Sequence, residues 1–282
     1  MDGPQIIAAT LTRPSVPDKF GNLWQYHSRS DRHSKVACWT VLFEVLQHSS
    51  VMQRHAADGK VVFGVNREMR DFRTNRTKDL DLVIARPGSS ETTGRVTLSD
   101  LAVRWNISLT REQLDILESL PALIEGATGS VLVALEAKAC MTAHIKALPR
   151  LFDELNSSHD TVHGENDGTI AAGFVMINAA ETFISPDLNR HDLTITHPVV
   201  SEHHQPLWAN RALAKVREIQ RRNTRTGFGF DAVGVMMVDM RNDGGPVSVV
   251  TGDPAPPPGD SLHYEQMVRR IVHLYDTSYG GI

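Results

Sequence analysis

Two opposite charges close an apolar run near the middle of the chain. Residues 131–135 are all apolar; Glu136 follows directly, and Lys138 comes after one alanine. Because side chains alternate across a strand, Glu136 and Lys138 are expected on the same face. Asp81 stands between two leucines in an earlier apolar run. If the two strands are neighbours, Asp81 and Glu136 converge at one edge of the sheet.

This grouping favours a divalent cation. Burying one carboxylate costs several kcal/mol unless it is paired, and a second carboxylate adds like-charge repulsion. Lys138 offsets one charge, and Mg²⁺ (or Mn²⁺) bound by Asp81 and Glu136 would offset the rest, since Mg²⁺ needs few protein oxygens. Such an ion can acidify a water and stabilise charge on a phosphoryl oxygen. Lys138 could then orient that water or stabilise the phosphorus centre.

The same residues resemble the PD-(D/E)XK nuclease superfamily, the fold of many restriction endonucleases. Members carry an acid on the second core strand and E-x-K on the third, within the order helix, three strands, helix, strand. Asp81 in "LDLVI" and Glu136 and Lys138 in "LEAK" match these positions. Glu44 in "VLFEVLQ" matches an acid that some members place on the first helix. The resemblance covers roughly residues 35–180.

The resemblance implies a Mg²⁺-dependent endonuclease that hydrolyses DNA phosphodiester bonds, of restriction or phage-defence type. Asp81 and Glu136 would bind the metal, Lys138 would position the attacking water, and Glu44 would assist. The substrate would be double-stranded DNA, and a homodimer is expected if both strands are cut. Two departures are a leucine where proline often precedes the first acid, and the long interval between the two acidic positions.

Other interpretations remain open at this stage. Asp79 is a rival for Asp81, the E-x-K pair could be a surface salt bridge, and Glu44 could be hydrogen-bonded to a core partner. A catalytically silent nuclease fold could bind nucleic acid or a protein. Residues 97–117 have the spacing of a helix-turn-helix with a turn near Asn106, which would suit a transcriptional regulator. An enzyme acting on RNA or a nucleotide would use the same metal chemistry.

The elements that must position these residues follow from periodicity and turn signals. We expect an α/β fold: a restriction-endonuclease-like core with a mixed central sheet flanked by helices. A polar arm, 1–34, precedes a single domain, 35–282, which contains a helical insert at 86–128 and an α/β extension at 206–282. Strands are predicted at 60–65, 79–85, 130–138, 168–180, 231–240 and 247–251. Helices are predicted at 34–50, 148–155 with Pro149 at its start or a kink, 206–225 and 260–275.

Two basic segments could contact a phosphate backbone. The first is the charged connection 66–77, which leads directly to Asp81, and the second is the helix from 206. The predicted nucleic-acid-binding residues are Arg67, Arg70, Arg73, Arg76, Arg211, Lys215, Arg221 and Arg222.

Composition narrows the class of protein. The chain has 282 residues, 41% hydrophobic and 22% charged, which is ordinary for a globular protein. Its net charge of −4 gives no global basic field, so any phosphate backbone must meet a local patch. Two cysteines, Cys38 and Cys140, are too few for a disulfide framework. No apolar run reaches the ~20 residues of a membrane span, and the start lacks a secretory signal pattern, so a cytoplasmic location is expected.

Overall fold

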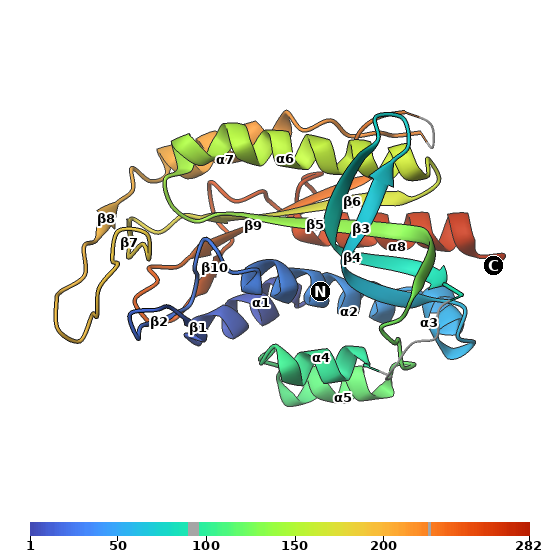
Figure 1. Ribbon diagram of the computed structural model, residues 1–282, viewed down its shortest axis with the longest axis horizontal. Helices are drawn as coiled ribbons and strands as arrows, with labels where there is room; N and C mark the ends of the chain where they lie inside the picture. The colour runs from blue at the N-terminus through green and yellow to red at the C-terminus, as the bar shows by residue number, and fades with distance from the viewer. Residues whose placement is uncertain (90–95, 225–226) are drawn as a thin grey trace.

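A six-stranded mixed sheet forms the centre of the molecule, with helices on both faces (Figure 1). The computed structural model describes residues 1–282 except 90–95 and 225–226. The strand order is β10-β9-β6-β5-β4-β3. The strands are β3 Val62–Asp71, β4 Arg76–Pro87, β5 Thr128–Cys140, β6 Ile170–Asn178, β9 Ala232–Asp239 and β10 Ser248–Val250.

The sheet mixes two kinds of pairing. The pairs β3–β4, β4–β5 and β9–β10 are antiparallel, whereas β5–β6 and β6–β9 are parallel. Every residue of β6 is buried, and its sequence is almost wholly apolar or small, as expected for a parallel strand covered on both faces. The predicted α/β architecture with a mixed, helix-flanked sheet is confirmed at this level.

One face of the sheet is covered by α6, His144–Glu165, and α7, Leu207–Arg217 (Figure 1). Buried Leu151, Leu155 and Val162 recur at helical spacing on α6 and pack on this face. Pro149 was expected at the helix start or at a kink; it lies inside α6, which excludes the helix start. Helix α7 also ends at Arg217, well before the predicted end at 225.

The opposite face is covered by α1, Gly3–Thr12, α2, Arg32–His48, α3, Ser50–Ala57, and α8, Tyr264–Tyr279. The prediction of a polar arm over 1–34 was wrong for α1. Ile6, Ile7 and Leu11 of α1 are almost fully buried in the core. Proline in the first turn of α1 is compatible with a helix, because its missing N–H would have no partner there.

The insert between β4 and β5 contains two short helices, as predicted. They are α4, Leu98–Arg104, and α5, Arg111–Ser119, and each begins with a capping box, at Thr97 and Thr110. Asn106 takes a positive φ of 51° in the turn between them. Four strands of two residues lie outside the main sheet: β1 Val16–Pro17, β2 Leu23–Trp24, β7 Thr182–Phe183 and β8 Ser201–Glu202.

The charged connection 66–77 is mostly strand. β3 continues to Asp71 and β4 begins at Arg76, because Met69 and Leu80 bury their side chains beneath α6 while Arg67, Glu68 and Arg70 are exposed. The Asp71 carboxylate closes the turn by accepting hydrogen bonds from the Arg73 N–H and the Thr74 hydroxyl. None of the described helices is long and apolar enough to cross a membrane.

Candidate active site

Strands β4 and β5 bring Asp81 and Glu136 together. The two strands are neighbours, and Leu82 pairs with Leu135 across the ladder. One step further along each strand, Asp81 Oδ2 accepts a hydrogen bond of 2.8 Å from the Ala137 N–H. Because that nitrogen is bonded to the carbonyl carbon of Glu136, the Asp81 carboxylate lies one peptide unit from Glu136.

Two lysines contact the Glu136 carboxylate. Lys138 Nζ lies 2.6 Å from Glu136 Oε1, and Lys78 Nζ lies 3.6 Å from the same oxygen. Glu136 is only 1% exposed, so these cations stabilise a charge that has lost nearly all contact with water. The sequence analysis placed Lys138 here but missed Lys78. The sequence did offer one sign of Lys78: it lies three residues before Asp81 on the same strand.

Helix α6 closes this group of charges. Lys78 Nζ donates hydrogen bonds to the Glu154 carbonyl oxygen at 2.6 Å and to the Ser157 and Ser158 hydroxyls at 3.0 and 2.6 Å. The Glu154 carboxylate lies 3.7 Å from Lys138 Nζ and accepts a hydrogen bond from Arg150 at the surface. The site therefore spans β4, β5 and α6.

Burial and the neighbouring charges shift the pKa values of Asp81, Lys78 and Lys138. Burial, followed by the nearby Glu136 charge, raises the pKa of Asp81 to about 6. Burial lowers the pKa of Lys78. Burial also acts to lower the pKa of Lys138, but its contact with Glu136 outweighs this, and the Lys138 pKa rises. Lys138 thus stays protonated, whereas Asp81 is the carboxyl group that an added cation would ionise.

The oxygen atoms present fit a hard divalent cation. Glu136 Oε2 is buried and has no hydrogen-bond partner among the described residues, and the Asp81 carboxylate is held at the Ala137 N–H, the next residue along β5. Carboxylate oxygens are the ligands that Mg²⁺ and Mn²⁺ prefer. The part of the chain that the structure describes contains no group of three or more His, Cys, Asp or Glu residues placed to hold a metal. Water or substrate oxygens would have to complete the coordination, as is usual for Mg²⁺.

A cavity of about 470 Å³ opens beside Asp81 and Lys138. Its walls come from the segment before and at the start of α2, from the end of β5 and from α6. Asp81 and Lys138 both line it, together with Ser34 of α2 and with Arg150 and Glu154 of α6. A phosphate group entering this space would meet Lys138 and Asp81 directly.

Comparison with known proteins gives no relative. No protein-family model, no curated protein and no solved structure matches the chain. The case for a function therefore depends on the geometry of Asp81, Glu136 and Lys138 and on the surfaces around them.

Glu44 does not join this group, and the expectation that it completes the metal site was wrong. It lies on α2 about 15 Å along the helix axis from Ser34, at 1.5 Å per residue. Its Oε1 accepts a hydrogen bond of 2.9 Å from the Gly3 N–H at the start of α1. A side chain on Gly3 would come within 2.6 Å of Glu44 Oε2, so glycine permits this close approach. Burial raises the pKa of Glu44.

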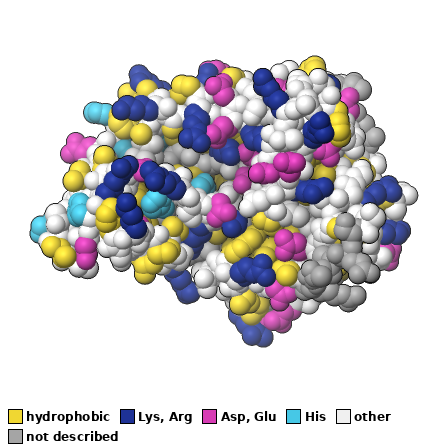
Figure 2. Space-filling model, in the orientation of Figure 1, with side chains coloured by type: hydrophobic (Ala, Val, Ile, Leu, Met, Phe, Trp, Pro, Cys, Tyr) yellow, Lys and Arg dark blue, Asp and Glu magenta, His cyan; other side chains and the backbone are white. Residues whose placement is uncertain are grey.

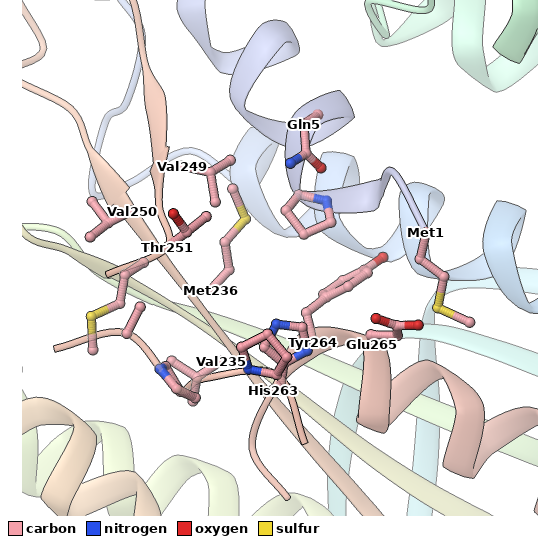
Figure 3. Close-up of a pocket in the computed structure, with 15 residues that line it drawn as sticks. Met1, Gln5, Val235, Met236, Val249, Val250, Thr251, His263, Tyr264 and Glu265 are labelled. Carbon is pink, nitrogen blue, oxygen red and sulfur yellow. The ribbon is translucent and has the colours of Figure 1, made fainter. Parts of the chain in front are cut away.

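A separate small cavity lies near that end of α1. It has a volume of about 180 Å³ between α1, β9, β10 and the start of α8. Figure 3 shows Tyr264 and His263 beside it, with Gln5 reaching in from α1. None of its lining residues lines the cavity beside Asp81.

Several of the predicted phosphate contacts are occupied by other partners. Arg73 pairs with Asp71 at 3.2 Å, and Lys215 pairs with Glu218 at 2.6 Å. Arg70 donates to Asn75. Arg73 and Lys215 thus pair with acids of their own segments and Arg70 with an asparagine, so counting lysines and arginines overstated their freedom to bind phosphate.

Arg222 is buried and structural, which corrects its assignment as a nucleic-acid contact. Its guanidinium pairs with Asp231 at 2.8 Å and donates to the carbonyl oxygens of Asp167 and Thr169. The neighbouring Arg221 is exposed and donates to the Ser261 hydroxyl. Arg67, Arg76 and Arg211 are exposed on the surface, and none of the eight predicted contacts lines the cavity beside Asp81.

Proposed function

We propose that this protein is a divalent-cation-dependent endonuclease that hydrolyses DNA phosphodiester bonds. One observation carries the proposal: Lys138 Nζ lies 2.6 Å from Glu136, and Asp81 is hydrogen-bonded to the Ala137 N–H between them, at the wall of an open cavity. Two carboxylates and one lysine at a shared position form a set of groups suited to metal-assisted phosphoryl chemistry.

The order of elements supports the same proposal. Apart from α3 and the α4–α5 insert, the chain runs α2, β3, β4, β5, α6, β6, with two antiparallel pairings followed by a parallel one. This is the order of helix, three strands, helix and strand that the resemblance to PD-(D/E)XK nucleases implies. We therefore infer a restriction-endonuclease-like core, with the α4–α5 insert and the segment after β6 as additions.

Each residue has a distinct part in the proposed reaction. Asp81 and the free Oε2 of Glu136 would hold the cation, which when bound supplies Lewis acidity to the scissile phosphate. Lys138 would orient the attacking water and stabilise negative charge at the phosphorus centre. Lys78 would link Glu136 to α6, because its ammonium group lies near the carboxylate and donates hydrogen bonds to the helix. The cavity would admit the phosphate and exclude bulk water.

A second candidate is a catalytically silent protein of the same fold that binds nucleic acid. The observation in its favour is that Lys78 and Lys138 already neutralise Glu136, while a pKa near 6 leaves part of Asp81 protonated near neutral pH. The pocket is then electrically balanced without a metal. Cleavage and metal binding separate the two candidates.

The deciding experiment is cleavage of supercoiled plasmid and of circular single-stranded DNA with Mg²⁺, with Mn²⁺ or with EDTA. Circular substrates have no ends, so any product reports endonuclease activity. We expect metal-dependent cleavage by the wild type and a loss of at least ~100-fold in Glu136→Gln and in Lys138→Ala. Asp79→Asn is the matched control, because Asp79 is exposed on the same strand and should retain activity within about twofold.

The outcomes are distinct. Absence of cleavage on both substrates, with no Mn²⁺ binding by calorimetry, would support the silent protein instead. Equal rates for wild type and Lys138→Ala would remove the lysine from the reaction, and a loss of activity in Asp79→Asn comparable to Glu136→Gln would show that the acids were assigned wrongly.

A further inference from the structure

The cavity beside Asp81 adjoins a second cavity of about 240 Å³, because Arg29 lines both. Lys19, Phe20, His27 and Arg190 line the second cavity as well. Figure 2 shows lysine and arginine side chains gathered around a histidine at the end of the molecule that carries β7 and β8. Arg29 thus lies between the two cavities, and the first of them is also lined by the candidate catalytic residues Asp81 and Lys138.

The wall shared by both cavities, residues 18–34, is rigidly held although it has little regular structure. The Asp18 carboxylate accepts hydrogen bonds from the backbone N–H groups of Phe20 and Asn22, from the Asn22 amide and from the Trp24 indole. These bonds hold its pKa at about 2 despite burial, which acts to raise it. Asn242 braces the next part of the wall by accepting from the backbone N–H of Tyr26. A ligand would therefore meet a preformed surface.

Aromatic rings are interleaved with the cations along this wall. Phe20 and His27 line the second cavity, and Tyr26 and His33 line the first. The Tyr26 and His33 ring centroids are 5.1 Å apart. Burial raises the pKa of Tyr26 to about 12, so its ring is neutral at physiological pH. Alternating aromatic and basic side chains are typical of surfaces on which bases stack while cations follow the phosphates.

Arg29 has fewer charged partners than Arg73, Lys215 and Arg222, three of the cations predicted from the sequence. The Arg29 guanidinium is exposed and has no ion pair or hydrogen bond with any other described residue. Lys19 Nζ lies 5.1 Å from the Phe20 ring centroid, and Arg190 approaches Asp187 only to 3.8 Å. Asp18 is engaged by neutral donors, so it does not pair with these cations.

We propose that the two cavities together form a path that binds one unpaired strand of DNA, with Arg29 holding a phosphate adjacent to the scissile one. This inference rests on the proposed nuclease function and specifies its substrate. The faces of the bases must be free to stack on Tyr26, His27 and Phe20, and in a duplex those faces are covered by stacking on the neighbouring base pairs. The strand is thus taken either from single-stranded DNA or from a locally opened duplex.

The test is equilibrium binding measured by fluorescence anisotropy in EDTA, where no cleavage occurs. The probes are a thymidine oligonucleotide about 15 nucleotides long and a hairpin duplex of similar length. We expect the oligonucleotide to bind at least tenfold more tightly than the duplex. Arg29→Ala should weaken oligonucleotide binding at least fivefold and reduce the slope of log K against log salt by about 0.7, the value for one phosphate contact. Arg54→Ala, an exposed arginine on α3, is the matched control and should change neither quantity.

A second variant tests whether bases stack on the aromatic rings of the wall. His27→Ala should weaken oligonucleotide binding while leaving the salt slope unchanged, since it removes a ring and not a cation. Duplex binding as tight as or tighter than that of the oligonucleotide, or an Arg29→Ala protein that binds like the wild type, would overturn the inference.

The two proposals can fail separately. Glu136→Gln should lose cleavage and keep oligonucleotide binding, because Glu136 lies beneath the path and not along it. If the wild type binds the oligonucleotide as expected but cleaves nothing, the path is supported and the nuclease proposal fails. If it cleaves DNA but prefers the duplex in binding, only the proposed strand path fails.

Discussion

Replacing Asp81 with asparagine should make the protein more stable at neutral pH while removing its proposed activity. The folded structure resists ionisation of Asp81, because burial and the Glu136 charge raise its pKa from 3.8 to about 6. Asparagine keeps an oxygen that can accept the hydrogen bond from the Ala137 N–H but carries no charge. The variant therefore resembles the protonated form of Asp81 at every pH.

The size of the effect follows from the pKa values of the two states. A rise from 3.8 to about 6, at 1.36 kcal/mol per pKa unit, corresponds to about 3 kcal/mol. The folded protein binds this proton more tightly than the unfolded chain, so the contribution is fully present below pH 4 and is lost as pH rises through 6. Asp81 lines the cavity and keeps some contact with solvent, which makes 3 kcal/mol an upper value.

The assay is urea unfolding of wild type and Asp81→Asn in EDTA at pH 4, 6 and 8. Taking the difference between the two proteins cancels the titrations of groups that do not interact with Asp81. We expect nearly equal free energies of unfolding at pH 4 and an advantage for the variant that grows to between 1 and about 3 kcal/mol at pH 8. A difference that does not change between pH 4 and pH 8 would refute the reasoning.

Adding metal should remove most or all of the stability advantage of the variant at pH 8. Mg²⁺ at one hundred times its dissociation constant should stabilise the wild type by about 2.7 kcal/mol. The Asp81→Asn variant, with one carboxylate fewer, should gain much less. Equal stabilisation of both proteins by Mg²⁺ would show that Asp81 does not bind the ion.

Three further substitutions test the surrounding contacts. Lys138→Ala leaves Glu136 with only the longer Lys78 contact, so the free energy of unfolding should fall by about 2 kcal/mol in urea titrations. Arg222→Ala strands the buried Asp231 charge and should cost about 3–5 kcal/mol, while the salt slope of oligonucleotide binding stays unchanged where the protein remains folded. Glu44→Gln keeps an acceptor for the Gly3 N–H, and calorimetry should find its Mn²⁺ affinity equal to that of the wild type.

The pair Glu136 and Lys138 could be predicted from the sequence because the rule behind it is local. An apolar run fixes the strand, and alternation then puts both side chains on one face. Placing Asp81 beside them needed the further assumption that β4 and β5 are neighbours across the long insert, and the ladder between Leu82 and Leu135 bears it out. The helical insert was likewise predictable from its own periodicity.

Other features depend on contacts between distant segments, which no local pattern reveals. The polar, proline-containing start gave little sign of α1, which is stabilised by burying Ile6, Ile7 and Leu11 against the core. Helix α7 ends at Arg217, and the residues that follow it take a different course, in which Arg222 pairs with Asp231 just before β9. Glu44 resembled a metal ligand by position, but its partner is the start of a helix that the sequence analysis read as an arm.

Asn242 is a further contact between segments that are distant in the sequence. Its side-chain oxygen accepts the backbone N–H groups of Gln25 and Tyr26, and its amide donates to the carbonyl oxygens of Tyr26 and Ile184. One amide in the turn after β9 thus sets the position of a wall more than two hundred residues earlier in the chain. Substitutions at this turn would shift residues 25 and 26 and so change the affinity of the proposed strand path for DNA, although Asn242 itself would not contact the DNA. The residues of the proposed reaction would stay unchanged.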